Sequence, residues 1–340
     1  MLRFVVRRLL LMIPVLFGLS LLLFAWLRAL PGDPARALLG ERATPEGIAR
    51  LNEQYGFDKP LVEQYLTYIG RLITGDFGSS PRTGEAVLPT FLERFPATIE
   101  LAVAALIFAI AIGIPLGYFA ARRAGGFLDL LAVGSSLAGV VIPVFVLAYV
   151  LKVIFAVGLP GLEFLAVLPT SGRQDPRIDA THITNFYVLD GLLTREWDAA
   201  LDAIVHLILP AIALGSIPLA IVVRMTRASV LEVLNEDYVR TANAKGLPRR
   251  WITTRHVLRN ALLPVVTTIG LQAGALLAGA VLTESVFAFN GIGSYLFEAI
   301  SSLDFAVLQG FILFIALTYA VVNLVVDILY GVIDPRMRVA

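Results

Sequence analysis

Six long apolar runs divide this chain of 340 residues and constrain its fold more than any other feature. Each run holds about 20 residues or more, and a helix rising about 1.5 Å per residue then crosses a hydrocarbon core of about 30 Å. With 58% hydrophobic and 16% charged residues, the chain has more apolar surface than one soluble core can bury. We therefore expect an all-α integral membrane protein with six transmembrane helices. The runs cover residues 9–29, 99–121, 130–157, 203–223, 262–288 and 307–330.

Basic residues at the ends of these runs predict their orientation. If every run spans the membrane, the basic clusters fall on one side, which the positive-inside rule makes the cytoplasm. Both termini are then cytoplasmic. The first run is longer than the apolar part of a typical signal peptide, and no small-x-small cleavage pattern follows it, so we expect it to remain as the first helix. The clusters are Arg3, Arg7 and Arg8, then Arg122 and Arg123, then the loop 224–264, and finally Arg336 and Arg338.

Two polar segments, 30–98 and 158–202, lie on the opposite side, and the first is too polar to insert. In the first, the sequences at 44–57 and 59–73 place apolar residues at helical spacing, which predicts short amphipathic helices against the external face. Two interpretations stay open for both segments: a lid packed on the helix bundle, or a docking surface for an external partner. The apolar positions of the second predicted helix are Leu61, Tyr65, Tyr68, Ile69 and Leu72.

The loop 224–264 is strongly basic and predicts ordered structure on the cytoplasmic side. A helix-forming run, DYVRTANAK, stops at Gly246 and Pro248, and a second run restarts at Trp251. Glycine is the residue at which a helix most often ends, so the pattern indicates a helix-turn-helix. A large ordered loop in the cytoplasm suggests a cytoplasmic partner.

The composition also argues against several classes of function. The chain has no cysteine and three scattered histidines, His182, His206 and His256, so the sequence predicts no metal site. It contains no G-x-x-x-x-G-K-[ST] phosphate loop, and we find no catalytic constellation and no cofactor motif. Its 27 basic and 26 acidic residues give no support to nucleic-acid binding. We therefore expect a protein that is not itself an enzyme.

An ordered set of motifs resembles the B-type permease of dipeptide and oligopeptide ABC importers, within the binding-protein-dependent transport inner-membrane components. Any one tetrapeptide is a weak signal, whereas the ordered set runs almost from end to end. The motifs are PGDP at 31–34, FDKPLVEQYLTYIGRLITGDFGSS at 57–80, RFPATIELA at 94–102, HLILPAIAL at 206–214, RMTRASVLEVLNEDYVRTANAKGL at 224–247, RHVLRNALLPVVT at 255–267, and DPRMR at 334–338.

The resemblance implies a type I importer in a bacterial or archaeal cytoplasmic membrane. Such an importer has a homologous second permease chain, which makes a heterodimer, two cytoplasmic ATP-binding subunits that hydrolyse ATP, and an extracytoplasmic peptide-binding protein. It further implies a division into residues 1–93 (first transmembrane helix and external segment), 94–333 (permease domain) and 334–340 (cytoplasmic tail). Dipeptides, longer peptides, nickel chelates and glutathione all stay open as cargo.

The resemblance also places a coupling helix in the cytoplasmic loop, where it fits a groove on the ATPase subunit. This sequence departs from the general family motif in two places: Arg240 stands where a glutamate is usual, and Arg259 where a later proline is common. Because Gly246 lacks Cβ, the backbone can reverse there at positive φ without penalty. The predicted ATPase-coupling residues are Asp237, Tyr238, Arg240, Thr241, Ala242, Lys245 and Gly246.

Polar residues inside the last two runs are the candidates for the translocation path and its gate. Charge in a bilayer is costly, so we expect Glu284 and Asp327 to face an aqueous cavity, a partner group or the interface. Hydrogen bonds between helices explain the presence of Asn323 and of the threonines in these apolar runs equally well. The alternative function, an ion-coupled secondary transporter, needs ionisable residues at the membrane midplane, which is almost free of charge here. The candidates are Thr268, Gln272, Thr283, Glu284, Asn323 and Asp327.

Overall fold

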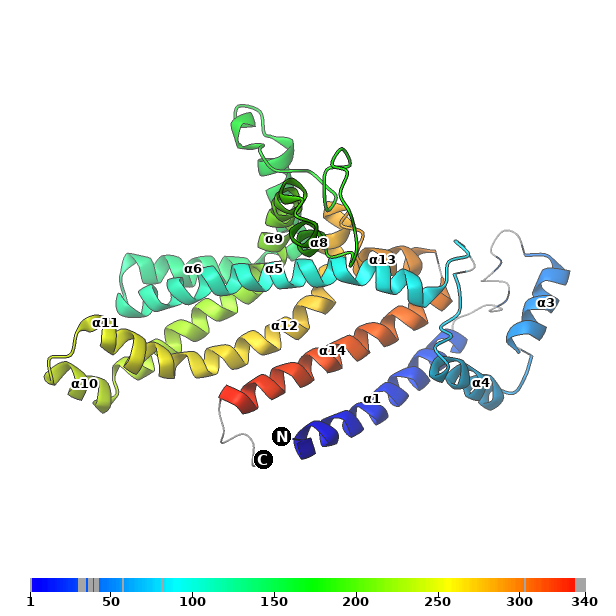
Figure 1. Ribbon diagram of the computed structural model, residues 1–340, viewed down its shortest axis with the longest axis horizontal. Coiled ribbons are helices and arrows are strands. Elements are labelled where there is room, and N and C mark those ends of the chain that lie inside the picture. The colour runs from blue at the N-terminus through cyan, green and yellow to red at the C-terminus, as the bar shows by residue number, and fades with distance from the viewer. Residues whose placement is uncertain are drawn as a thin grey trace. The chain divides into compact units, whose positions relative to one another are not determined.

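The computed structural model describes residues 2–29, 35, 39, 43–56, 58–80, 82–302 and 304–333, and most of these are folded into helices (Figure 1). The motifs at 31–34 and 334–338 lie outside the described residues. The α-helices are α1 (Leu2–Ala29), α3 (Pro45–Tyr55), α4 (Leu61–Ile73), α5 (Val87–Arg122), α6 (Phe127–Val141), α7 (Val144–Lys152), α8 (Tyr187–Thr194), α9 (Trp197–Leu234), α10 (Asp237–Ala244), α11 (Arg249–Trp251), α12 (Arg259–Phe287), α13 (Ile292–Ser301) and α14 (Phe305–Ile333). Two π-helical segments, η2 (Val153–Val157) and η4 (Ile252–Leu258), and a short 3₁₀ turn, η3 (Glu163–Leu165), complete the regular structure. The all-α prediction is confirmed.

Five helices in the described residues are long and apolar enough to cross a membrane, and a bent pair brings the number to six. Two of them extend well beyond the predicted runs, since α5 begins at Val87 and α9 ends at Leu234. At about 1.5 Å per residue, the 38 residues of α9 reach about 57 Å, so its ends stand outside the hydrocarbon core.

The third predicted run, 130–157, is not one straight span. It forms two helices, α6 and α7 with its continuation η2, whose axes differ by 104°. The break falls at Pro143, whose ψ of 135° is extended. Proline offers no N–H to the preceding turn and its ring drives the residue before it out of the helical region, so the first helix ends there.

Residues 97–289 pack as one unit around α9. Close approach of α5 is made possible by Gly117: a Cβ added there would lie 2.6 Å from the Val223 carbonyl oxygen and 2.7 Å from Thr226. Because glycine has no side chain, the backbones of α5 and α9 can approach each other closely at this point. An apolar cluster of this unit joins Ala148, Leu209 and Phe287, from α7, α9 and α12.

Residues up to 96 and from 290 onward form a second unit. Its core contains buried residues of α5, α13 and α14, including Phe91, Tyr295 and Phe311. A hairpin marked by the bridge between Ser79 and Ala86 precedes α5. The buried Ser80 hydroxyl donates to the Asp304 carboxylate at 2.5 Å and so ties this hairpin to the start of α14.

The short amphipathic helices predicted in the first polar segment are confirmed as α3 and α4. The hydroxyl oxygen of Thr44 accepts a hydrogen bond from the Gly47 N–H at 3.1 Å and caps the start of α3, and Gly56 ends that helix at φ 66°. On α4, the predicted positions Tyr65, Tyr68, Ile69 and Leu72 are half-buried, whereas Leu61 at the start of the helix is exposed.

Candidate functional site

The basic loop folds as the predicted helix-turn-helix. Helix α10 ends at Ala244, and the chain reverses at Gly246, whose φ is 69°. The Leu247 N–H reaches back to the Ala242 carbonyl at 3.3 Å, a bond typical of a helix closed by a left-handed residue. A Cβ at Gly246 would meet no atom within 4 Å, so glycine is favoured there by the backbone conformation and not by lack of space.

One face of α10 is buried within the chain itself. Val239 and Ala242, three residues apart on the helix, are 2% and 4% exposed. This packing attaches α10 to the adjoining ends of α5, α9 and α12. Their buried neighbours come from α5, α9, η4 and α12 and are Ala121, Val230, Ile252, Val257 and Ala261.

The opposite face of α10 is exposed and polar. Of the seven predicted coupling residues, only Ala242 turns inward; Asp237, Tyr238, Arg240, Thr241, Lys245 and Gly246 are exposed. Arg240 forms an ion pair with Asp237 at 3.3 Å, with side chains 69% and 95% exposed. A pair so exposed contributes little to stability, so both charges are available to a partner at small cost.

Two further contacts support this region, and sequence reasoning missed both. Arg227 on α9 holds the Asp129 carboxylate of α6 through two hydrogen bonds, and the Gly125 N–H donates to the same carboxylate at 2.8 Å. On α5, the Tyr118 hydroxyl lies 3.2 Å from that of Thr253 in η4. Asp129 stands directly before the apolar run 130–157. An acidic residue in such a place was the feature of the sequence that indicated a buried polar contact.

The predicted path residues lie on two helices of different units, Thr268, Gln272, Thr283 and Glu284 on α12, and Asn323 and Asp327 on α14. Glu284 is fully buried and accepts a hydrogen bond of 2.5 Å from the Thr98 hydroxyl of α5. An aqueous cavity, a partner group and the interface were the three surroundings expected for Glu284, and the structure shows a partner group, the Thr98 hydroxyl. Thr268 donates to the Pro264 carbonyl of its own helix at 2.9 Å. The side chain of Asp327 lies outside what the structure describes.

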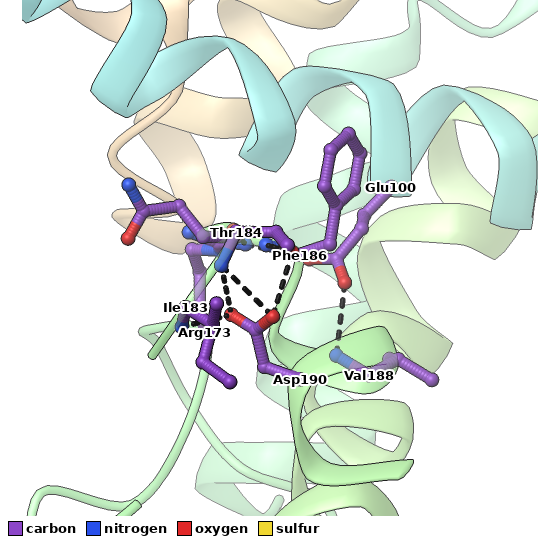
Figure 2. Close-up of polar contacts among 8 residues, drawn as sticks. Glu100, Arg173, Ile183, Thr184, Phe186, Val188 and Asp190 are labelled. Atoms are coloured by element: carbon purple, nitrogen blue, oxygen red, sulfur yellow. Dashed lines mark hydrogen bonds and ion pairs between the residues drawn. The ribbon is translucent and has the colours of Figure 1, made fainter. Parts of the chain in front are cut away.

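The second polar segment, 158–202, is ordered and is attached to α5 through Glu100 (Figure 2). Glu100 of α5 accepts from Arg173 at 2.6 Å and from the Val188 N–H at 2.9 Å. Asp190 of α8 is buried and accepts from the Thr184 hydroxyl at 2.6 Å. Hydrogen bonds from Thr181 lower the pKa of Glu196, just before α9. This packing fits the lid interpretation, and the exposed outer surface leaves docking open as well.

An apolar cavity of about 500 Å³ lies between α5 and α9 beside this segment. Phe186 and Val188 contribute to its wall together with aliphatic residues of both helices. Among the described residues that line it, Glu100 is the single ionisable one, and its carboxylate is engaged by Arg173 and Val188. A peptide brings a charged amine, a carboxylate and amide groups that require polar partners, so this cavity is unsuited to bind a peptide.

Comparison with known proteins gives the family. Residues 113–339 match the family described as the binding-protein-dependent transport system inner membrane component, and residues 1–102 match the N-terminal part of such membrane components. Three similar proteins align over 99% of both chains. The di/tripeptide transport system permease protein DppB of Pseudomonas aeruginosa (strain UCBPP-PA14) is 49% identical, and the dipeptide transport system permease protein DppB of Escherichia coli (strain K12) is 46% identical. The glutathione transport system permease protein GsiC of Escherichia coli O1:K1 / APEC is 36% identical.

These matches agree with the helices described above. Apolar helices of membrane-spanning length and full-length similarity to permeases make this chain a multi-pass inner membrane protein. Its relatives are named as permease proteins of transport systems. The chain therefore belongs to the binding-protein-dependent transport system inner membrane components, the family of type I ABC importer permeases.

Proposed function

We propose that this chain is a permease subunit of an ATP-driven importer of short peptides. The observation that carries the proposal is full-length identity of 46–49% with permeases named for dipeptide or di/tripeptide transport. The relative named for glutathione is more distant, at 36%. Dipeptides and tripeptides are therefore the cargo we assign. Family membership also favours an ATP-driven importer over the ion-coupled alternative.

The exposed face of α10 is the proposed contact with a cytoplasmic ATPase subunit. Its charged residues are solvent-exposed, and its other face is anchored by Val239 and Ala242 against the ends of the membrane helices. When the ATPase subunits close on ATP, α10 moves with them, and its apolar anchor transmits the movement to α9 and α12. The membrane helices then open toward the loaded binding protein, and the peptide enters.

The remaining subunits follow from this assignment. A homologous second permease completes the translocation path, two ATP-binding subunits dock on the cytoplasmic side, and a peptide-binding protein docks outside. Both termini and α10 then lie in the cytoplasm, as the basic clusters favour. We assign the candidates on α12 and those on α14 to the translocation path or its gate, and place the division between the N-terminal part and the permease domain at residues 93 and 94.

Reconstitution in proteoliposomes tests the proposal. Together with the second permease, the ATPase subunits and the binding protein, this chain should support uptake of a labelled dipeptide that requires ATP. The same liposomes without ATP, and liposomes with this chain alone, are the matched controls, and neither should show uptake. Hydrolysis of ATP by the isolated chain, or uptake driven by an ion gradient without ATP, would overturn the proposal.

A further inference from the structure

Helix α4 carries more apolar surface than its contacts within the chain account for. Its apolar residues occupy two neighbouring faces, one built from Tyr65, Tyr68 and Leu72 and the other from Val62, Leu66, Ile69 and Ile73. The second set follows the i, i+4, i+7, i+11 spacing of a single helical stripe, which we call the outer stripe. Each face therefore needs a separate partner.

The first face packs against α1. The Tyr65 ring lies 6.0 Å from that of Phe17 and 5.3 Å from that of Phe24, and the Tyr68 ring lies 6.0 Å from the Phe24 ring. The Tyr65 hydroxyl lies 2.9 Å from the Ser20 hydroxyl, which is itself buried. These contacts hold α4 alongside the second half of α1 (Figure 1).

The depth of α4 follows from these contacts. The membrane-spanning part of α1 covers Val5–Trp26. Ser20 lies six residues before Trp26, which at about 1.5 Å per residue places it about 9 Å inside the end of that span. A helix whose tyrosine reaches Ser20 and Phe17 lies at the level of the bilayer and not above it.

Three of the four residues of the outer stripe are exposed, and the fourth, Ile69, is half-buried. Val62, Leu66 and Ile73 are 70%, 63% and 81% exposed. The neighbouring surface of α1 is apolar too, because Phe17, which contacts α4, and Leu21, one turn further along the same side of α1, are exposed as well. The polar residues Glu63 and Thr67 lie on the remaining arc of α4 and are exposed. An apolar arc, a polar arc and tyrosines between them are typical of a helix that lies in a membrane interface.

We propose that α4 lies in the bilayer leaflet at the C-terminal end of α1, with lipid acyl chains covering the outer stripe. Lipid fits better than a protein partner because the stripe is wholly aliphatic, without the aromatic or arginine anchors that dominate protein interfaces. The depth of α4 in the bilayer, and the continuity of the outer stripe with the exposed apolar surface of α1, also favour lipid as the partner. The first external segment is on this basis anchored in lipid along α4, an assignment independent of the cargo.

The absence of cysteine from the chain makes the test direct. Single cysteines at Leu66 and Ile73 sample the outer stripe, and single cysteines at Glu63 and Thr67 serve as matched controls on the polar arc of the same helix. All four positions are exposed, so the substitutions leave the packing on α1 intact. The assembled transporter is placed in nanodiscs and treated with a charged maleimide, and in parallel is labelled with bimane in detergent before transfer to brominated lipid.

We expect the maleimide to modify Leu66→Cys and Ile73→Cys several-fold more slowly than Glu63→Cys and Thr67→Cys. We also expect the bimane at Leu66→Cys and Ile73→Cys to be quenched by brominated acyl chains, with little quenching at the two control positions. Fast modification of the outer stripe would show that it faces water and would overturn the proposal. Slow modification without quenching would show that protein covers it, which overturns the proposal equally.

Discussion

The Arg173 guanidinium lies 2.6 Å from the Glu100 carboxylate, and both side chains are only 9% exposed. The same guanidinium stacks 3.7 Å above the Tyr187 ring and donates to the Asn185 carbonyl at 2.7 Å. This ion pair therefore joins the second polar segment, 158–202, to α5.

Removing one partner of this pair should destabilise the protein. An uncompensated buried charge costs about 3–5 kcal/mol, whereas removing both charges costs much less. We expect Arg173→Met and Glu100→Gln each to lower the thermal unfolding midpoint of the purified transporter clearly. The double variant should lose less than the sum of the two single losses. Additive losses would mean that the two side chains are not energetically coupled, which contradicts the geometry.

The pair of Asp129 and Arg227 should support coupling, because α9 continues from Arg227 into the loop that carries α10. Hydrogen bonds to a charged group contribute about 1.5–3 kcal/mol each, so Asp129→Asn should loosen α6 from α9. We expect reduced peptide uptake for each ATP hydrolysed. The exchange Asp129→Arg with Arg227→Asp should restore part of the loss. It cannot restore all of it, because the Gly125 N–H also requires an acceptor at position 129.

Asp198→Asn is the matched control for that substitution. It also replaces an aspartate by asparagine, but at an exposed position in the first turn of α9, whereas Arg227 lies near the end of that helix. The control should leave the ratio of uptake to hydrolysis unchanged. If Asp129→Asn behaved like the control, the pair would have no part in coupling.

Gly246 offers a test of the turn alone. A valine at φ 69° is strained, whereas asparagine tolerates this conformation, and neither meets a neighbour at Cβ. A left-handed residue costs about 1–2 kcal/mol for an ordinary side chain. We therefore expect Gly246→Val to weaken co-purification of the ATPase subunits and to lower uptake, and Gly246→Asn to retain most of both. Equal behaviour of the two variants would exclude the conformational explanation.

Helix positions and the turn at Gly246 could be predicted because both depend on local sequence, namely apolar length and a residue that tolerates positive φ. Whether each proline would end its helix could not be predicted. Helix α9 continues through Pro210 and Pro218, whereas the chain breaks at Pro143, and packing around each helix decides between these outcomes. The buried pairs were also missed. Their partners lie 73 and 98 residues apart, and helical periodicity carries no information about such contacts.

The sharpest prediction concerns Arg240, which departs from the general family motif. Its side chain is 69% exposed and pairs with Asp237 on its own helix, so Arg240→Glu should change stability by less than about 0.5 kcal/mol. At a docked interface, however, reversing a charge opposite a matched acidic group costs far more than losing an exposed pair. We therefore expect normal membrane insertion together with reduced ATPase co-purification and reduced hydrolysis stimulated by the binding protein. Arg123→Glu is the matched control, because it reverses an exposed charge in the loop after α5, predicted to lie on the same side of the membrane, and should leave both quantities at wild-type values. Wild-type values for Arg240→Glu would mean that α10 is not the contact through which ATP hydrolysis drives this permease.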